Sequence, residues 1–369
     1  MKIKAFFITI AVVTLVLCAV TPARALEYDL SGIYNSLSDE ARGSLLSIGA
    51  GSADPNTLQS LTPESIFGQI GTVASQQAAQ PLRALIHITA VLLIGAMLSA
   101  CHSSLSAETG DLVNTAAALC ISAAVAAPAV GVIEQAQNVI LAASNLMLAY
   151  VPVMAVLLAA GGSVAGSGSY YASVLLTGEG VAQLCSRVIV PFLNMFLGLS
   201  IVSGVTPQVR LGGVTAMVSR IFKWLLGFAM AVFSAVIGAK QLLSNAIDSA
   251  SGRAVRFAVS SFVPVVGGAL ADAYKTVQGS IGLLKSGVGV FVILAVAFTF
   301  LPALLQCMLW AVALHVGRLS AEVLHLPQAG RLLEGLAAVF SVLIALLLCV
   351  TAIFIIATAV VLLTGGGAA

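Results

Sequence analysis

Charged residues are scarce in this chain of 369 residues, making up only 8% of the sequence. A soluble globular domain carries roughly 25% charged residues, so water cannot be the solvent for most of this surface. The 16 Lys and Arg residues nearly balance the 14 Asp and Glu residues, which leaves no basic excess for nucleic acid. The scarcity of charge therefore excludes an ordinary cytosolic enzyme, a disordered regulator and a nucleic-acid-binding protein.

Motifs for catalysis or cofactor binding are also missing from the sequence. There is no GxxxxGK[ST] or GxGxxG phosphate loop, no HExxH metal motif and no GxSxG nucleophile elbow. The six cysteines form no CxxC pair, and no carboxylate stands at ligand spacing from two of the four histidines. We expect no enzymatic activity, no cofactor and no metal site.

Long apolar runs are what the sequence has instead, since 60% of its residues are hydrophobic. A helix needs about 20 apolar residues to cross a bilayer. The runs predict an all-α polytopic membrane helix bundle over residues 83–369, with about seven transmembrane helices and one re-entrant or broken helix. The seven candidate spans are residues 85–101, 112–133, 139–160, 188–205, 221–243, 288–314 and 336–363.

The first 25 residues have the pattern of a signal peptide. Lys2 and Lys4 precede a short apolar run, and the small residues Ala23 and Ala25 stand where a signal peptidase cleaves. An uncleaved anchor helix is the alternative, although the run of 16 apolar residues is short for one. Either interpretation places the following residues outside the cytoplasm.

Residues 26–82 differ in composition from everything after them. Acidic residues, Ser, Gly and Gln dominate, and Pro63 followed by Glu64 is typical of the first turn of a helix. Such a short segment cannot build a rich core alone. We expect a small extracytoplasmic helical region that lies on the bundle or docks a partner.

The orientation of the bundle does not follow from its Lys and Arg residues. An outside N-terminus and seven crossings would put the C-terminus inside, with six cations in inside loops and seven outside. A bias of cations toward the cytoplasmic loops is what normally sets the orientation. The count of cations therefore favours neither topology.

Two polar residues lie in the middle of predicted spans, Asn194 and Gln306. Each is a candidate for a hydrogen bond between helices or for part of a translocation path. Ionisable residues are otherwise confined to the edges of spans, whereas an ion-coupled carrier places several in its core.

Residues 257–271 form an apolar stretch too short for a confident crossing. Within it Ser260 and Ser261 precede a half-length apolar run, Pro264, Gly267 and Gly268 interrupt that run, and Asp272 follows it. Broken helices at membrane depth line a wet cavity or are buried in protein. We expect a re-entrant or broken half-helix that acts in a pathway or as a close-packed hairpin; a full crossing would reverse the topology of everything after it.

The same stretch carries a family resemblance. Residues 260–270 (SSFVPVVGGAL) and 279–289 (GSIGLLKSGVG) resemble stage III sporulation protein AE of endospore-forming bacteria. The resemblance extends over most of the chain, through residues 150–153 (YVPV), 190–194 (VPFLN), 199–203 (LSIVS) and 223–227 (KWLLG). It implies a multi-pass protein of the mother-cell membrane around the forespore, and it brings no catalytic residues with it.

The resemblance also implies partners. Other stage III A sporulation proteins would join this chain in a channel or secretion-like complex that sustains late forespore development, with a forespore membrane protein on the other side. Two alternatives remain, an autonomous permease for a small solute and, with less support, an intramembrane enzyme. The lipid bilayer is the surrounding partner in each of them.

Overall fold

The computed structural model describes residues 31–50, 63–101, 107–161, 164–205, 212–262 and 267–363. These residues form helices and contain no strand. The signal-peptide prediction for residues 1–25 and the position of Pro264 lie outside the described residues. In chain order the elements are α2 (Ser31–Asn35), α3 (Asp39–Ser47), α5 (Pro63–Gln77), α6 (Ala79–Cys101), α7 (Ala107–Ala160), α8 (Val164–Leu184), η1 (Cys185–Ile189), α9 (Val190–Val205), α10 (Gly212–Phe262), α11 (Gly267–Val323) and α12 (Pro327–Leu363).

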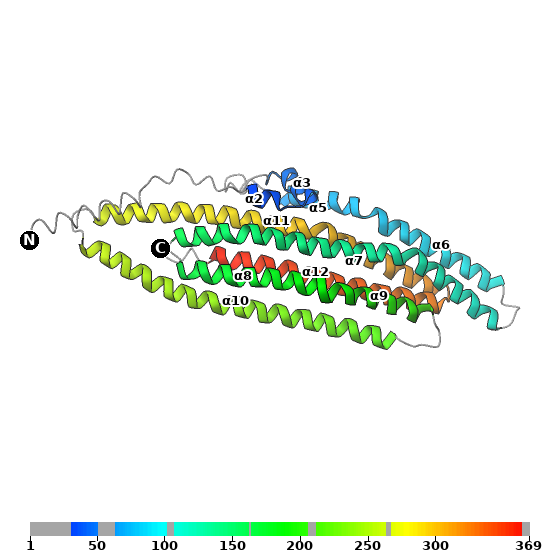
Figure 1. Cartoon of the computed structure of the whole chain (residues 1–369). Helices are drawn as coiled ribbons and strands as arrows, with labels where there is room; N and C mark the ends of the chain where they lie inside the picture. The colour runs from blue at the N-terminus through cyan, green and yellow to red at the C-terminus, as the bar shows by residue number, and fades with distance from the viewer. Residues whose placement is uncertain are drawn as a thin grey trace, which may run out of the picture.

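The long helices lie side by side in one elongated bundle (Figure 1). Helix α12 runs through its middle and packs against α11, α10, α9 and α7. Its composition explains this place, because it contains the most apolar of the candidate spans, with a mean hydropathy of 3.1. Trp310 of α11 and Phe340 of α12 are fully buried and stack with ring centroids 5.6 Å apart. The all-α membrane bundle predicted from the apolar runs is therefore confirmed.

Six helices in the described part of the chain are long and apolar enough to cross a membrane. The difference from the predicted seven lies in α7, where the two spans at residues 112–133 and 139–160 belong to one continuous helix. Its 54 residues would extend about 80 Å, more than twice the ~30 Å hydrocarbon core of a bilayer. Separate antiparallel crossings for these two spans are thus a wrong prediction.

The polar sequence between those two spans explains the continuity of α7. The two predicted spans leave residues 134–138 (EQAQN) as a connection between them, yet Glu, Gln and Ala are good helix formers. Gln137 also finds a partner within the bundle, since its Nε2 donates a hydrogen bond to Ser186 Oγ at 3.0 Å. The polar stretch therefore continues the helix and ties it to η1.

A π-helical turn joins α8 and α9 into one helical run. This turn, η1, ends two residues before Pro191. Proline has no N–H and its ring clashes with the carbonyl group four residues earlier, here that of Arg187. Widening the turn around Arg187 relieves the clash and lets the helix continue through the proline.

The stretch at residues 257–271 is not a separate half-helix. Residues 257–262 form the last turns of α10 and residues 267–271 the first turns of α11. The two helices run antiparallel and meet beyond the ends of the neighbouring helices (Figure 1). No separate half-helix forms there because α10 continues beyond its apolar span, Thr215–Lys240, and α11 begins before its own, Gly287–Val323. The ends of these two long helices take up the stretch.

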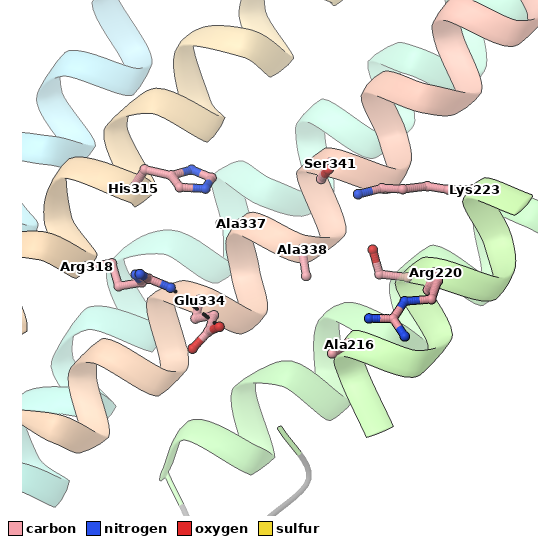
Figure 2. Close-up of a pocket in the computed structure, with 10 residues that line it drawn as sticks. Ala216, Arg220, Lys223, His315, Arg318, Glu334, Ala337, Ala338 and Ser341 are labelled. Atoms are coloured by element: carbon pink, nitrogen blue, oxygen red, sulfur yellow. Dashed lines mark ion pairs between the residues drawn. The ribbon is translucent and has the colours of Figure 1, made fainter. Parts of the chain in front are cut away.

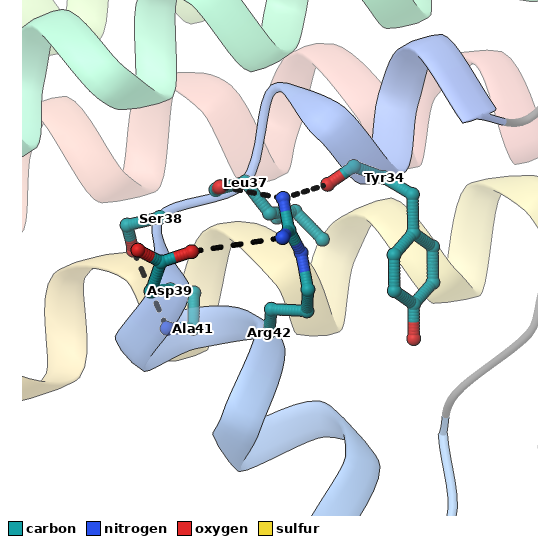
Figure 3. Close-up of polar contacts among 6 residues, drawn as sticks. All are labelled: Tyr34, Leu37, Ser38, Asp39, Ala41 and Arg42. Atoms are coloured by element: carbon teal, nitrogen blue, oxygen red, sulfur yellow. Dashed lines mark hydrogen bonds and ion pairs between the residues drawn. The ribbon is translucent and has the colours of Figure 1, made fainter.

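The N-terminal helices pack on the bundle rather than around a core of their own. Helices α3 and α5 contact α11, and α2 contacts α7. Tyr34 stacks on Phe291 of α11, with ring centroids 5.8 Å apart. Arg42 holds the connection between α2 and α3, donating from Nη2 to the carbonyl oxygens of Tyr34 (2.9 Å) and Leu37 (3.4 Å) (Figure 3).

Two further features fix this N-terminal region. Ser38 caps α3 by accepting a hydrogen bond from the backbone N–H of Ala41, and Asp39 pairs with Arg42 at 3.6 Å (Figure 3). Burial raises the pKa of the Tyr34 phenol above its ordinary value, and the nearby Arg42 opposes this by a smaller amount. The tyrosine is therefore neutral at physiological pH.

Candidate functional site

The two polar residues predicted in mid-span are inside the bundle. Gln306 of α11 is buried, and its Nε2 donates a hydrogen bond to Gln80 Oε1 of α6 at 3.3 Å. Among the described residues, Gln306 Oε1 and Asn194 Oδ1 are buried polar atoms without a hydrogen-bond partner. Gln306 thus links two helices, while both side chains retain an acceptor that could serve another group.

The other predicted site residues lie far from this pair. Ser260 and Ser261 belong to the last turn of α10, and Gly267, Gly268 and Asp272 to the first turns of α11. Asp272 and Gln306 are 34 residues apart on the same helix, which corresponds to about 50 Å. The structure does not bring the two groups of candidates into one site.

A groove between α10, α11 and α12 gathers charged side chains that the sequence does not place together (Figure 2). Its volume is about 450 Å³. We call it the charged groove. It is lined by Ala216, Ser219, Arg220 and Lys223 of α10, His315 and Arg318 of α11, and Glu334, Ala337, Ala338 and Ser341 of α12.

Arg318 is the centre of an ion-pair network on one side of the charged groove. Its Nη1 lies 3.4 Å from Glu334 Oε1 of α12, and its Nε lies 3.4 Å from Glu322 Oε1 on its own helix. The Arg318 side chain is only 33% exposed, so solvent screens these pairs less than fully exposed ones. The network joins α11 to α12 and neutralises Arg318.

The opposite side of the charged groove carries cations from α10. Arg220 and Lys223 are exposed and have no ion-pair partner in the part of the chain that the structure describes. His315 faces them from α11 (Figure 2). Its Nδ1–H donates to the Ala311 carbonyl oxygen at 2.6 Å, which leaves Nε2 free of that bond. The exposed cations Arg220 and Lys223, with His315 across from them, suit the binding of an anion.

Helical spacing was the signal for the charged groove. Arg220 and Lys223 stand three residues apart, as do His315 and Arg318, and such pairs share a face of a helix. Spacing along one helix does not show that the two pairs meet, because that depends on the packing of α10 against α11 and α12. For metal binding, no group of three or more His, Cys, Asp or Glu side chains gathers among the described residues.

The bundle and its apolar spans define a class, that of all-α polytopic membrane proteins. Comparison with known proteins adds the particular family. The family model described as stage III sporulation protein AE matches residues 56–365. The chain belongs to this family, which confirms the resemblance drawn from its sequence and gives it a role in sporulation.

A curated relative agrees with this assignment. The stage III sporulation protein AE of Bacillus subtilis (strain 168) is 26% identical to this chain over 158 residues, which is 42% of the chain. The match spans 40% of the length of that relative. No solved structure matches the chain.

Proposed function

We propose that this protein is an integral membrane subunit of the stage III A channel or secretion-like complex, which links the mother cell and the forespore and is required for late forespore development. The family assignment supports a sporulation role. The chain would contribute structure and contacts rather than catalysis, and any energy-consuming step would come from a partner. Its partners would be other stage III A proteins and, through them, a forespore membrane protein.

The observation that carries this proposal is the length of α10 and α11. Helix α10 continues for 22 residues after its apolar span ends at Lys240, and α11 begins 20 residues before Gly287. We call residues 241–262 and 267–286 the helical arms. At 1.5 Å per residue each arm reaches about 30 Å beyond the apolar spans. Helices that extend this far leave the bilayer and can meet another protein there.

The location follows from the same proposal. The chain would sit as a multi-pass protein in the mother-cell membrane that surrounds the forespore, after export led by the N-terminal signal peptide. Its N-terminal region would then be extracytoplasmic. The packing of α3 and α5 on α11 supports a region that is held against the bundle, where a partner could contact both.

Autonomous transport of a small solute is the second candidate. The buried and unpartnered oxygens of Asn194 and Gln306 favour it, because a path through the bundle needs polar atoms that a solute can contact. Purified protein in liposomes separates the candidates. Solute movement by this chain alone would support a permease. Liposomes that contain the chain and retain their solute would agree with a subunit that needs its partners.

Shortening the helical arms tests the proposal directly. Deleting residues 245–251 and 276–282 removes about two turns from each arm, and the remaining residues keep nearly the same helical phase. We expect the variant to insert and fold normally but to lose its partners and to fail to restore spore formation in a deletion strain.

The matched control keeps the arm length. In the control, residues 245–251 and 276–282 are replaced by segments of the same length made of Ala, Glu and Lys, which maintain a helix. The comparison separates the effect of arm length from the effect of arm surface chemistry. Normal spore formation with both altered chains would contradict a role for the arms. A normal unfolding temperature in detergent shows that the bundle itself is intact in each variant.

A further inference from the structure

The charged groove contains two cations, Arg220 and Lys223, that form no ion pair with any of the described residues. Arg220 and Lys223 share one face of α10 because they stand one helical turn apart. Their side chains extend toward α12 (Figure 2). Arg318 is occupied by Glu322 and Glu334, so these carboxylates are already engaged. The free positive charge of the groove therefore faces outward from α10.

An exposed apolar surface continues from these cations along α10. Trp224 is 68% exposed and stacks on Phe228, with ring centroids 5.6 Å apart. Val232 and Val236 extend the same helix as exposed apolar side chains. Tryptophan is enriched where the hydrocarbon core of a membrane meets the headgroups. The order along the helix is thus cations first, then an interfacial aromatic pair, then aliphatic residues.

The charged groove lies near one end of the bundle, where α9 ends, α10 begins, α11 ends and α12 begins (Figure 1). Arg318 stands five residues before the end of α11, and Arg220 stands eight residues after the start of α10. These spacings correspond to roughly 8 to 12 Å from the helix ends. Arg220 and Arg318 also stand only five residues inside the ends of their apolar spans, Thr215–Lys240 and Gly287–Val323. The ends of membrane-spanning segments lie next to the headgroup layer, so a lipid headgroup can reach both side chains.

We propose that the charged groove binds the headgroup of an anionic phospholipid. The phosphodiester oxygens would accept hydrogen bonds from Arg220 and Lys223, and Ser219 and Ser341 lie beside these cations as additional hydroxyl donors. The acyl chains would lie on Trp224 and Phe228. Basic pockets between membrane helices bind anionic headgroups by this chemistry.

A zwitterionic lipid fits the charged groove less well. The phosphate of phosphatidylcholine carries the same charge, but its trimethylammonium group would approach Arg220 and Lys223 and be repelled. A free phosphate ion would gain the same charge contacts without the apolar contacts to Trp224 and Phe228. The groove should therefore rank phosphatidylglycerol above both phosphatidylcholine and inorganic phosphate.

Native mass spectrometry of the full chain in detergent tests this proposal, with phosphatidylglycerol, phosphatidylcholine and inorganic phosphate as probes. The wild-type protein should bind phosphatidylglycerol at least tenfold more tightly than either other probe. The double variant Arg220→Gln, Lys223→Gln should bind phosphatidylglycerol about tenfold or more weakly than the wild type, since each cation near a membrane surface contributes measurably. The variant Arg220→Lys, Lys223→Arg should keep most of the binding.

The control variant Arg83→Gln, Arg187→Gln removes two exposed cations elsewhere on the bundle. It should bind phosphatidylglycerol like the wild type, which separates a local site from attraction by overall charge. If this control and the Arg220→Gln, Lys223→Gln variant lost phosphatidylglycerol affinity equally, the proposal would be overturned. Equal affinities for inorganic phosphate and phosphatidylglycerol would overturn the lipid as the occupant.

Two further outcomes are decisive. If the Arg220→Gln, Lys223→Gln variant does not fold, Ser341→Trp fills the charged groove while keeping its cations, and wild-type lipid binding by that variant would overturn the proposal. If the double variant keeps its lipid but loses co-purifying proteins from sporulating cells, the groove is a protein contact and the lipid assignment is wrong.

Discussion

Gly204 of α9 lies so close to Leu332 of α12 that a Cβ atom at position 204 would be 2.5 Å from Leu332 Cβ and 2.7 Å from Leu332 Cα. Real Cβ atoms do not approach backbone this closely, so the two helices would have to separate. Gly335 makes a milder approach from α12, since a Cβ atom there would be 3.1 Å from Ser200 Cβ. The contact between α9 and α12 therefore depends on these glycines.

Replacing Gly204 with alanine should therefore destabilise the bundle. We expect Gly204→Ala to cost about 2 kcal/mol, within the usual range for overpacking, and Gly335→Ala to cost less. Gly198→Ala on the same helix is the matched control, because nothing lies within 4 Å of a Cβ atom there. Thermal unfolding in detergent measures the three variants. Equal unfolding temperatures for Gly204→Ala and Gly198→Ala would contradict this close approach.

The continuity of α7 can be measured as a distance. Leu119 and Leu148 are both exposed and stand 29 residues apart. Spin labels at these positions, with the native cysteines replaced by alanine, should be about 43 Å apart along one straight helix. Two antiparallel spans that turn near residue 136 would bring the labels within about 15 Å of each other. Pulsed electron paramagnetic resonance of the labelled protein in nanodiscs distinguishes these two distances.

Most of the helical architecture could be predicted from the sequence, because apolar runs of about 20 residues report directly on membrane helices. Residues 134–138 mislead, because a polar segment between two apolar runs usually indicates a loop. Those residues are helix formers, and the partner Ser186 that satisfies Gln137 is 49 residues away. Hydrogen bonds of that range do not appear in a local pattern.

Helical spacing pairs Arg220 with Lys223 and His315 with Arg318, but the meeting of these pairs in the charged groove could not be predicted, for a related reason. Arg220, Arg318 and Glu334 come from three helices, and the first two are nearly 100 residues apart. A window that averages hydropathy treats each of them as the edge of a span. Their convergence depends on how α10, α11 and α12 pack, which the sequence of any single helix does not specify.

The hydrogen bond between Gln306 and Gln80 distinguishes a packing role from a transport role. Gln80→Leu leaves Gln306 Nε2 buried without its partner, which should cost about 1–3 kcal/mol. Replacing both residues by leucine removes the unpaired group, so the double variant should regain most of that stability. Thermal unfolding of the wild type, Gln80→Leu, Gln306→Leu and the double variant gives the coupling energy between the two side chains.

Spore formation by the same double variant separates the two roles. A packing pair can be replaced by apolar side chains without loss of function, so spore counts should stay near those of the wild type. A stable double variant that inserts normally but forms no spores would instead favour a solute path through Gln306.

Arg42 is expected to hold the N-terminal region on the bundle. Arg42→Met keeps the apolar stem but removes the hydrogen bonds to Tyr34 and Leu37 and the ion pair with Asp39. We expect amide hydrogen exchange in residues 41–48 to increase by about tenfold or more, equivalent to a loss of about 1–3 kcal/mol. Arg83→Met on the exposed face of α6 is the control. Unchanged protection in the Arg42 variant would show that apolar burial alone holds the region.

The proposed function makes this chain one member of a membrane assembly during sporulation. Affinity purification of the tagged full-length protein from sporulating cells, followed by identification of the polypeptides that accompany it, tests that claim most directly. We predict that other stage III A proteins co-purify with the intact chain and are lost when residues 245–251 and 276–282 are deleted. Recovery of the protein alone, together with normal spore formation in its absence, would contradict the claim.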